Sequence, residues 1–269
     1  MKILNAEFVT SAAPRLAPPG LARGKPPADM GGIPRDGLAQ FAFAGRSNVG
    51  KSTLLNALVR QKVARTSAAP GKTRLANIIR ITAEGGPGGP GRWSCYFVDL
   101  PGYGYARGGD DAAKELAAVA EAYFGAAGER PRPERAAGGQ PGAAGPASES
   151  AWGWGPTRSE KSRPAADGIR ATFLLVDSRH PGLKSDVQAH RWLSELAGPP
   201  MVVATKVDKL SRAERTRNLR ELERVFGTAA QPVSATSGEG MDELWRTIAN
   251  LARGIGAADA ATADDSSSR

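Results

Sequence analysis

The sequence predicts an α/β fold, with a mostly parallel six-stranded sheet flanked by helices on both faces. Two observations lead to this prediction. Short apolar runs with the length of buried strands alternate with segments whose apolar residues recur at helical spacing. A glycine-rich loop, GRSNVGKS, lies between one such run and one such helix. Strands that alternate with helices form parallel sheets covered on both sides.

The first half of the predicted sheet is arranged around this loop. Gln40–Ala44 is an apolar run that leads into a glycine, and Lys51–Arg60 carries its leucines at helical spacing. Asn77–Ala83 and Arg92–Val98 are strand-like and flank the turn sequence EGGPGGPG, which indicates an antiparallel hairpin. A helix over Ala112–Phe124 completes this half.

The second half begins with a continuous apolar run. This run, ATFLLV, predicts a fully buried strand, and a charged segment with one apolar stripe predicts an amphipathic helix later in the chain. In chain order the predicted elements are the strand Ala171–Val176, the helix Ser185–Ala197, the strand Pro200–Ala204, the helix Arg212–Phe226, the strand Gln231–Val233 and the helix Met241–Ala252.

Low-complexity segments delimit the folded part of the chain. The 269 residues include 33 glycines and 20 prolines, many of them clustered. Such clusters cannot bury enough apolar surface to offset chain entropy. We therefore predict a largely flexible N-terminal segment 1–37, a folded α/β domain 38–253 with a low-complexity insertion at about 125–168, and a disordered tail 254–269.

The charge balance favours a polyanionic partner. The formal net charge is +9, which favours nucleic acid or a ribonucleoprotein, although charges that are only solvated would give the same number. No apolar run approaches the roughly 18 residues of a membrane span, and the N-terminus lacks the apolar core of a signal peptide. The single cysteine excludes an intrachain disulfide. These features predict a cytoplasmic protein without a membrane span.

The segment GRSNVGKS, Gly45–Ser52, matches the phosphate-binding pattern G-x-x-x-x-G-K-S in the strand–loop–helix context that the pattern requires. Its glycines let backbone N–H groups surround phosphates at a helix N-terminus. Lys51 is expected to reach the β- and γ-phosphates, and Ser52 to coordinate Mg²⁺. The pattern alone does not separate ATP from GTP.

The stretch TKVD, Thr205–Asp208, indicates that the base is guanine. It lies at the C-terminal end of a buried strand, where nucleotide sites occur in doubly wound sheets. The Asp208 carboxylate can accept hydrogen bonds from guanine N1–H and the N2 amino group, which adenine cannot supply. Lys206 can lay its alkyl stem on the base, and backbone N–H groups of Val233–Ala235 can face guanine O6. This pattern argues against a P-loop kinase or ATPase.

The sequence DLPGY marks a predicted switch. Asp99 ends a strand and can hold the Mg²⁺ shell through water, while Gly102 can donate its N–H to the γ-phosphate. Upstream, Thr73 is a candidate second Mg²⁺ ligand in a segment that γ-phosphate and metal would order. Ras-type switches carry a water-orienting glutamine after this glycine. Tyr103 has no amide, so we expect slow hydrolysis that depends mostly on charge stabilisation.

The motifs in their order resemble the EngB family of bacterial Era-like GTPases. They are GRSNVGKS, PGKTR, DLPGYGYA, VDSRHP, TKVDKL and SA, and the resemblance covers most of residues 1–252 apart from loops. It implies a Ras-like P-loop G domain that binds GTP and Mg²⁺, acts in assembly of the large ribosomal subunit and is needed for normal cell division and septation. The insertion 125–168 and the long segment 12–37 depart from the family pattern.

The resemblance carries a GTP site onto this chain residue by residue. The predicted binding residues are Gly45, Arg46, Ser47, Asn48, Val49, Gly50, Lys51, Ser52, Gly71, Lys72, Thr73, Arg74, Leu75, Asp99, Leu100, Pro101, Gly102, Thr205, Lys206, Val207, Asp208, Val233, Ser234 and Ala235. Lys51, Thr73 and Gly102 are the predicted catalytic residues, and Ser52 and Thr73 the predicted Mg²⁺ ligands.

Asn48 has two interpretations. In related GTPases with a hydrophobic residue in place of the glutamine, an asparagine at this place ligates K⁺, whose charge acts beside the phosphates. Alternatively, Asn48 only shapes the loop.

Two classes of function fit these predictions. In the first, a monomeric GTPase binds the large ribosomal subunit or its rRNA precursor and leaves after hydrolysis of GTP to GDP. In the alternative, the chain is a nucleotide-gated protein-interaction module in cell division, with no direct ribosomal role.

Overall fold

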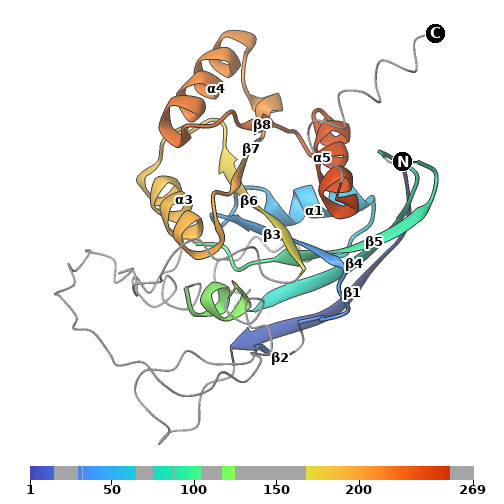
Figure 1. The fold of residues 1–269 in the computed structure, drawn as a ribbon. Helices are drawn as coiled ribbons and strands as arrows, with labels where there is room; N and C mark the ends of the chain where they lie inside the picture. The colour runs from blue at the N-terminus through green and yellow to red at the C-terminus, as the bar shows by residue number, and fades with distance from the viewer. Residues whose placement is uncertain are drawn as a thin grey trace, which may run out of the picture.

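The structure, a computed structural model, describes residues 1–14, 30–31, 33–64, 75–87, 89–103, 117–124 and 168–254. Within these residues the strands form one sheet in the order β2-β1-β4-β5-β3-β6-β7-β8 (Figure 1). The strands are β1 (Lys2–Pro14), β2 (Met30–Gly31), β3 (Ala39–Gly45), β4 (Ala76–Glu84), β5 (Arg92–Asp99), β6 (Ile169–Asp177), β7 (Met201–Thr205) and β8 (Gln231–Pro232). The helices are α1 (Lys51–Val59), α3 (Lys184–Ala197), α4 (Arg212–Phe226) and α5 (Met241–Arg253), and residues 117–124 are also helical.

The predicted fold class is confirmed. Strands β5, β3, β6, β7 and β8 pair in parallel, and β4 pairs with β5 as the antiparallel hairpin that the sequence predicts. These six strands correspond to the six predicted ones. Because the carboxyl ends of parallel strands meet at one edge of the sheet, the loops that follow β3, β5, β6 and β7 come together there.

Strands β1 and β2 lengthen the sheet beyond the six predicted strands. β1 runs antiparallel to β4 from the pair Lys2–Glu84 to the pair Ala12–Ala76, so residues 2–14 are structured, in contrast to the flexible segment expected over 1–37. The register shifts twice along β1. Each such bulge moves the following side chains to the other face, which removes the simple alternation by which a strand is detected in sequence.

Two apolar layers pack on the two faces of the sheet. On one face α1 and α5 cover the aromatic side chains of β3, β5 and β6, and the Trp245 indole N–H donates to the Leu58 carbonyl at 2.8 Å, which joins the two helices. On the other face lie α3, α4 and the helix 117–124. Tyr123 of that helix is fully buried and donates its hydroxyl to Gln40 of β3 at 3.1 Å.

Two predicted segments lie almost wholly outside the residues that the structure describes. The insertion predicted over 125–168 and the tail predicted over 254–269 lie outside the described residues except for Gly168 and Gly254. Among the described helices, none has the length and apolarity that crossing a membrane requires.

Candidate nucleotide-binding site

The loop 46–50 between β3 and α1 is packed closely against the sheet. A Cβ on Gly45 would lie 3.0 Å from the Leu175 carbonyl oxygen of β6, so a larger residue would push the loop away. Asn48 and Gly50 have φ angles of 65° and 104°, a left-handed conformation that glycine adopts freely and asparagine tolerates better than most residues. The tight turn ends directly at Lys51, the first residue of α1.

A buried ion pair lies next to this loop. The Lys51 ammonium donates a hydrogen bond to the carboxylate of Asp99, and their side chains are only 9% and 4% exposed. Asp99 is the last residue of β5, the strand that pairs with β3. The phosphate loop and the predicted switch are therefore joined by two charges that compensate each other in a place with little water.

Two residues of the TKVD stretch form hydrogen bonds with backbone carbonyls of the phosphate loop. The Thr205 hydroxyl contacts the Val49 carbonyl at 2.8 Å. The Lys206 ammonium donates to the Asn48 carbonyl at 2.7 Å and to the Asp177 carboxylate at 2.9 Å. Burial acts to raise the pKa of Asp177, but hydrogen bonds from Arg179 and Lys206 outweigh it and hold this pKa well below its usual range. Asp177 therefore stays charged and fixes Lys206.

Asp208 is held by the second predicted base segment. The Ser234 hydroxyl donates to the Asp208 carboxylate at 2.7 Å and accepts the backbone N–H of Ser237 at 3.0 Å. The hydrogen bond from Ser234 is the main cause that lowers the pKa of Asp208 below its usual value. The Val207 N–H also bonds the Val233 carbonyl at 3.4 Å. The two segments form one unit, the base loops, defined as Thr205–Asp208 and Val233–Ala235.

The structure thus brings together four of the five predicted segments at one edge of the sheet: the phosphate loop, the end of β5 and the two base loops. The fifth segment, Gly71–Leu75, lies outside the described residues except for Leu75, which is exposed. No metal-binding cluster of three or more His, Cys, Asp or Glu side chains occurs in the described part of the chain. This is compatible with Mg²⁺, which proteins commonly hold with one or two side chains plus the substrate phosphates.

Comparisons with known proteins place the chain in a family. A family profile described as "50S ribosome-binding GTPase" matches residues 40–127. The chain is 35% identical to "Probable GTP-binding protein EngB" of Pelotomaculum thermopropionicum over 92% of this chain and 96% of that protein. It is also 35% identical to the protein of the same name in Chlorobaculum tepidum, over 81% and 90%. The chain belongs to the EngB family.

Solved structures support the fold of this EngB-family GTPase. A probable GTP-binding protein engB aligns with a TM-score of 0.50 at 22% identity, over 80% of this chain and 99% of that one. The Era protein of Aquifex aeolicus, solved as a variant bound to GDP and AlF4⁻, aligns with a TM-score of 0.52 at 21% identity, over 78% and 55%. At these identities the likeness concerns the fold.

In this EngB-family chain, the residue after the DLPG glycine is a buried anchor. Tyr103 is 4% exposed, and its hydroxyl donates to the Asp186 carboxylate at 3.0 Å. The Arg46 guanidinium of the phosphate loop donates to the same oxygen at 2.9 Å. The Tyr103 carbonyl also accepts the Ser47 N–H at 2.8 Å. Burial, followed by the negative charge of Asp186, raises the pKa of Tyr103 well above its usual value. Tyr103 thus ties the switch to the phosphate loop and cannot orient a water from this position.

Asp177 and Asp186 are two site residues that sequence reasoning does not single out. Asp177 follows an apolar strand directly, as Asp99 does, and this shared position is a signal that could have found it. Asp186 lies in the first turn of α3 and is 1% exposed. Nothing local marks Asp186, because its role arises only where α3 packs beside the phosphate loop.

Proposed function

We propose that this GTPase is a GTP-controlled switch in the assembly of the large ribosomal subunit. It binds the particle or its rRNA precursor in the GTP state as a cytoplasmic monomer, leaves after hydrolysis, and is needed for normal cell division and septation. The observation that carries the nucleotide part is the direct joining of the base loops to the phosphate loop through Thr205 and Lys206. The name of the family profile and the net charge of +9 support the ribosomal part.

Guanine selection follows from the base loops. Ser234 engages Oδ1 of Asp208, and the exposed Lys209 ammonium lies 3.3 Å from Oδ2. The remaining lone pairs of the carboxylate can accept guanine N1–H and the N2 amino group. Adenine would leave this carboxylate unpaired, which is the kind of mismatch that gives strong discrimination. The αL backbone of Lys206, with φ of 61°, brings its side chain over the phosphate loop, where its stem can cover the base.

Phosphate and Mg²⁺ binding require the Lys51–Asp99 pair to exchange partners. Lys51 can transfer from Asp99 to the β- and γ-phosphates, while the freed carboxylate faces the Mg²⁺ shell. Ser52, the second residue of α1, would supply the direct ligand. Hydroxyl and carboxylate oxygens are the donors that Mg²⁺ prefers, so these residues fit the ion. Thr73 remains the proposed second protein ligand, with Gly71–Arg74 around it.

Hydrolysis in this site rests on charge. Lys51, the loop N–H groups and the Gly102 N–H stabilise the negative charge that develops on the phosphates, and a Mg²⁺ ion held at Ser52 would supply further positive charge there. Tyr103 holds Gly102 in place but supplies no amide for water. We therefore expect an intrinsic rate near the unstimulated Ras value of roughly 10⁻⁴ to 10⁻³ s⁻¹. A K⁺ ion beside Asn48 would add positive charge at the same place.

Co-sedimentation with large ribosomal subunits tests the switch. The protein should pellet with subunits when loaded with a non-hydrolysable GTP analogue and remain in solution with GDP. Asp208→Asn provides the matched control, because its association should follow xanthosine nucleotides instead. Association that ignores the bound nucleotide would contradict the switch, and nucleotide-gated binding to a cell-division protein without ribosomes would favour the alternative interaction module.

A further inference from the structure

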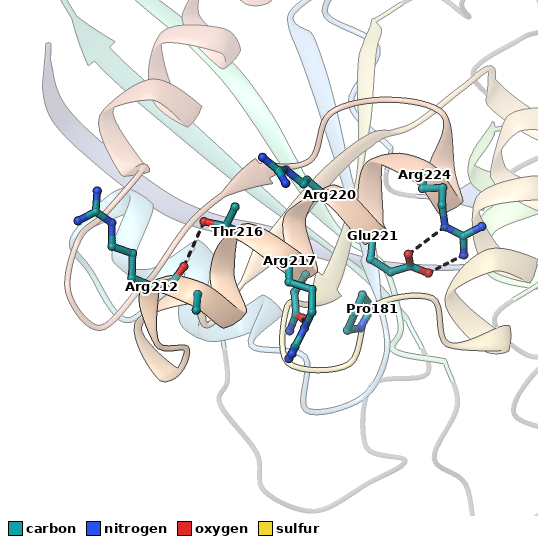
Figure 2. A pocket seen from close by; sticks show the side chains of 9 residues that line it. Pro181, Arg212, Thr216, Arg217, Arg220, Glu221 and Arg224 are labelled. Atoms are coloured by element: carbon teal, nitrogen blue, oxygen red, sulfur yellow. Dashed lines mark hydrogen bonds and ion pairs between the residues drawn. The ribbon is translucent and has the colours of Figure 1, made fainter.

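A groove with a basic lining lies between α4 and the loop that follows β6 (Figure 2). Its volume is about 940 Å³. We call it the arginine groove, and the lining residues that matter here are Pro181, Arg212, Arg217, Arg220, Glu221 and Arg224. All four arginines are exposed, and Glu221 is the one carboxylate in the lining.

The arginines of the groove differ in their partners. Arg224 donates two hydrogen bonds to Glu221, at 2.9 and 2.6 Å, which the dashed lines in Figure 2 mark. Over the described part of the chain, by contrast, Arg212, Arg217 and Arg220 form no ion pair with a carboxylate. Arg217 donates to the amide oxygen of Asn218 at 3.4 Å, a neutral partner that leaves its charge uncompensated. Like charges that share one groove repel one another, and a partner with several negative charges removes this repulsion.

The groove is built on a rigid element. Leu222 and Phe226 bury the inner face of α4, and Ser211 caps the start of the helix together with Glu214. The Asn218 amide donates to the Ser178 carbonyl at 2.9 Å, which ties the helix to the loop on the other side of the groove. At about 1.5 Å per residue, the stretch from Arg212 to Arg220 covers about 12 Å of helix. The three arginines are therefore spread along α4, and their side chains leave the helix in different directions (Figure 2).

We propose that the arginine groove binds the phosphate backbone of RNA, a proposal that deepens and rests on the ribosomal function above. Each guanidinium offers a planar set of donors that matches a phosphate group, which lysine cannot reproduce. In a protein interface, arginine anchors are commonly accompanied by buried aromatic side chains near the centre. The groove offers only Pro181 and Ala213 as apolar side chains, so its chemistry fits RNA better than a protein partner.

The loop that lines one side of the groove begins at the nucleotide site. Pro181 belongs to the loop that begins after Asp177, and Asp177 holds Lys206 of the base loops. Ser178, next in the chain, accepts the hydrogen bond from α4. The RNA surface and the base loops are thus attached to the same short segment.

Fluorescence anisotropy with a short labelled RNA of mixed sequence tests the proposal on the full chain loaded with a non-hydrolysable GTP analogue. The groove variant combines Arg212→Gln, Arg217→Gln and Arg220→Gln, and the helix should persist because glutamine is a good helix former. The matched control combines Arg80→Gln, Arg170→Gln and Arg246→Gln, which removes the same charge from exposed positions outside the groove.

The salt dependence of the affinity is the deciding quantity. Each phosphate contact adds about 0.7 to the slope of log affinity on log salt for a single strand, so the groove variant should lose about 2 from this slope. Its affinity at low salt should fall at least about tenfold, equally for different RNA sequences, while the control keeps most of the slope. An unchanged slope, or an equal loss in the control, would overturn the assignment.

Co-sedimentation separates this proposal from the function on which it rests. If the groove variant keeps its RNA affinity but no longer pellets with large subunits, the groove contacts a protein and the RNA assignment is wrong. If the variant loses RNA affinity and still responds to nucleotide in the pelleting assay, the groove proposal and the switch both stand. If neither the wild type nor the control pellets, the ribosomal function fails while the anisotropy result remains decisive for the groove.

Discussion

Two parts of the site differ in how their side chains are paired: the base loops, and the switch end, by which we mean Lys51 and Asp99–Tyr103. In the base loops, Thr205 and Lys206 bond carbonyls of the phosphate loop and Ser234 bonds Oδ1 of Asp208, and a guanine nucleotide would not need to displace these partners. Only the exposed Lys209 lies beside Oδ2 of Asp208, at 3.3 Å. At the switch end, Lys51 is bound to Asp99, and both groups must find new partners when phosphates and metal arrive. The base loops are therefore preorganised for binding, whereas the switch end is organised to change. Such a division suits a protein whose affinity for guanine is constant while its response depends on the γ-phosphate.

Removal of Lys51 should have the largest effect. Lys51→Ala leaves the Asp99 carboxylate buried without its partner, so the free energy of unfolding should fall by about 3 kcal/mol. Nucleotide affinity should fall at least about a hundredfold, because charge-assisted bonds to the phosphates are lost. Thermal or urea unfolding without nucleotide and fluorescent GDP titration measure the two effects.

The double variant Lys51→Ala with Asp99→Asn sharpens this result. It should regain much of the lost stability without regaining nucleotide affinity. If stability is not regained, the pair is not the structural link at the switch end.

Substitution in the base loops should change selectivity without affecting stability. Asp208→Asn should weaken GTP at least about a hundredfold and gain affinity for xanthosine triphosphate, whose carbonyl matches the new amide. Competition binding with both nucleotides measures the exchange, and melting curves should overlay the wild type. Equal GTP affinity in this variant would remove the base loops from guanine recognition.

The Tyr103 anchor should affect GTP more than GDP. Tyr103→Phe and Asp186→Ala remove the contact that holds the residue after Gly102, so single-turnover hydrolysis should fall about tenfold, at the scale of one hydrogen bond to a charged group. GDP affinity should be unchanged, because GDP has no γ-phosphate for Gly102 to contact. Combining the two changes should cost little more than either alone if Asp186 acts through Tyr103.

Asn218→Ala is the matched control for this anchor. Asn218 is also buried and bonded to a neighbouring loop, but it does not contact the switch. It should lower the melting temperature and leave the preference of GTP over GDP as it is. A similar change in that preference would show that the Tyr103 effect is general destabilisation.

The smallest expected effect concerns Asn48. If Asn48 ligates K⁺, single-turnover hydrolysis should be a few times faster in K⁺ than in Na⁺. The left-handed φ of 65° separates the two interpretations of this residue, because Asn48→Gly keeps that conformation and removes the amide. Loss of the K⁺ effect in Asn48→Gly supports ligation, whereas equal rates in both salts for the wild type leave a loop-shaping role.

The features that could be predicted from the sequence are those encoded by residues close together in the chain. The phosphate loop, the TKVD stretch and the six strands around them are recognisable because strand, turn and helix signals lie next to one another in the chain. It also showed that Tyr103 could not replace a glutamine. What Tyr103 does instead could not be predicted, because its partner Asp186 is distant in sequence and lies in an unremarkable helical turn. Strand β1 was not predicted for a different reason, because its two bulges break the alternation of its side chains.

The same bulges bear on how copies of this chain behave in a crowded solution. A strand at the edge of a sheet can act as a template for another chain, and regular exposed edges promote aggregation. Within the described residues only β2 pairs with the outer edge of β1, at Ala13 and Pro14, and Phe8 and Val9 are exposed nearby. The two register shifts interrupt the repeat of hydrogen-bonding groups along that edge. The opposite edge ends in β8, which is only two residues long. Irregularity at one edge and shortness at the other limit strand pairing between molecules, so a long N-terminal strand can be added to the sheet without favouring polymerisation.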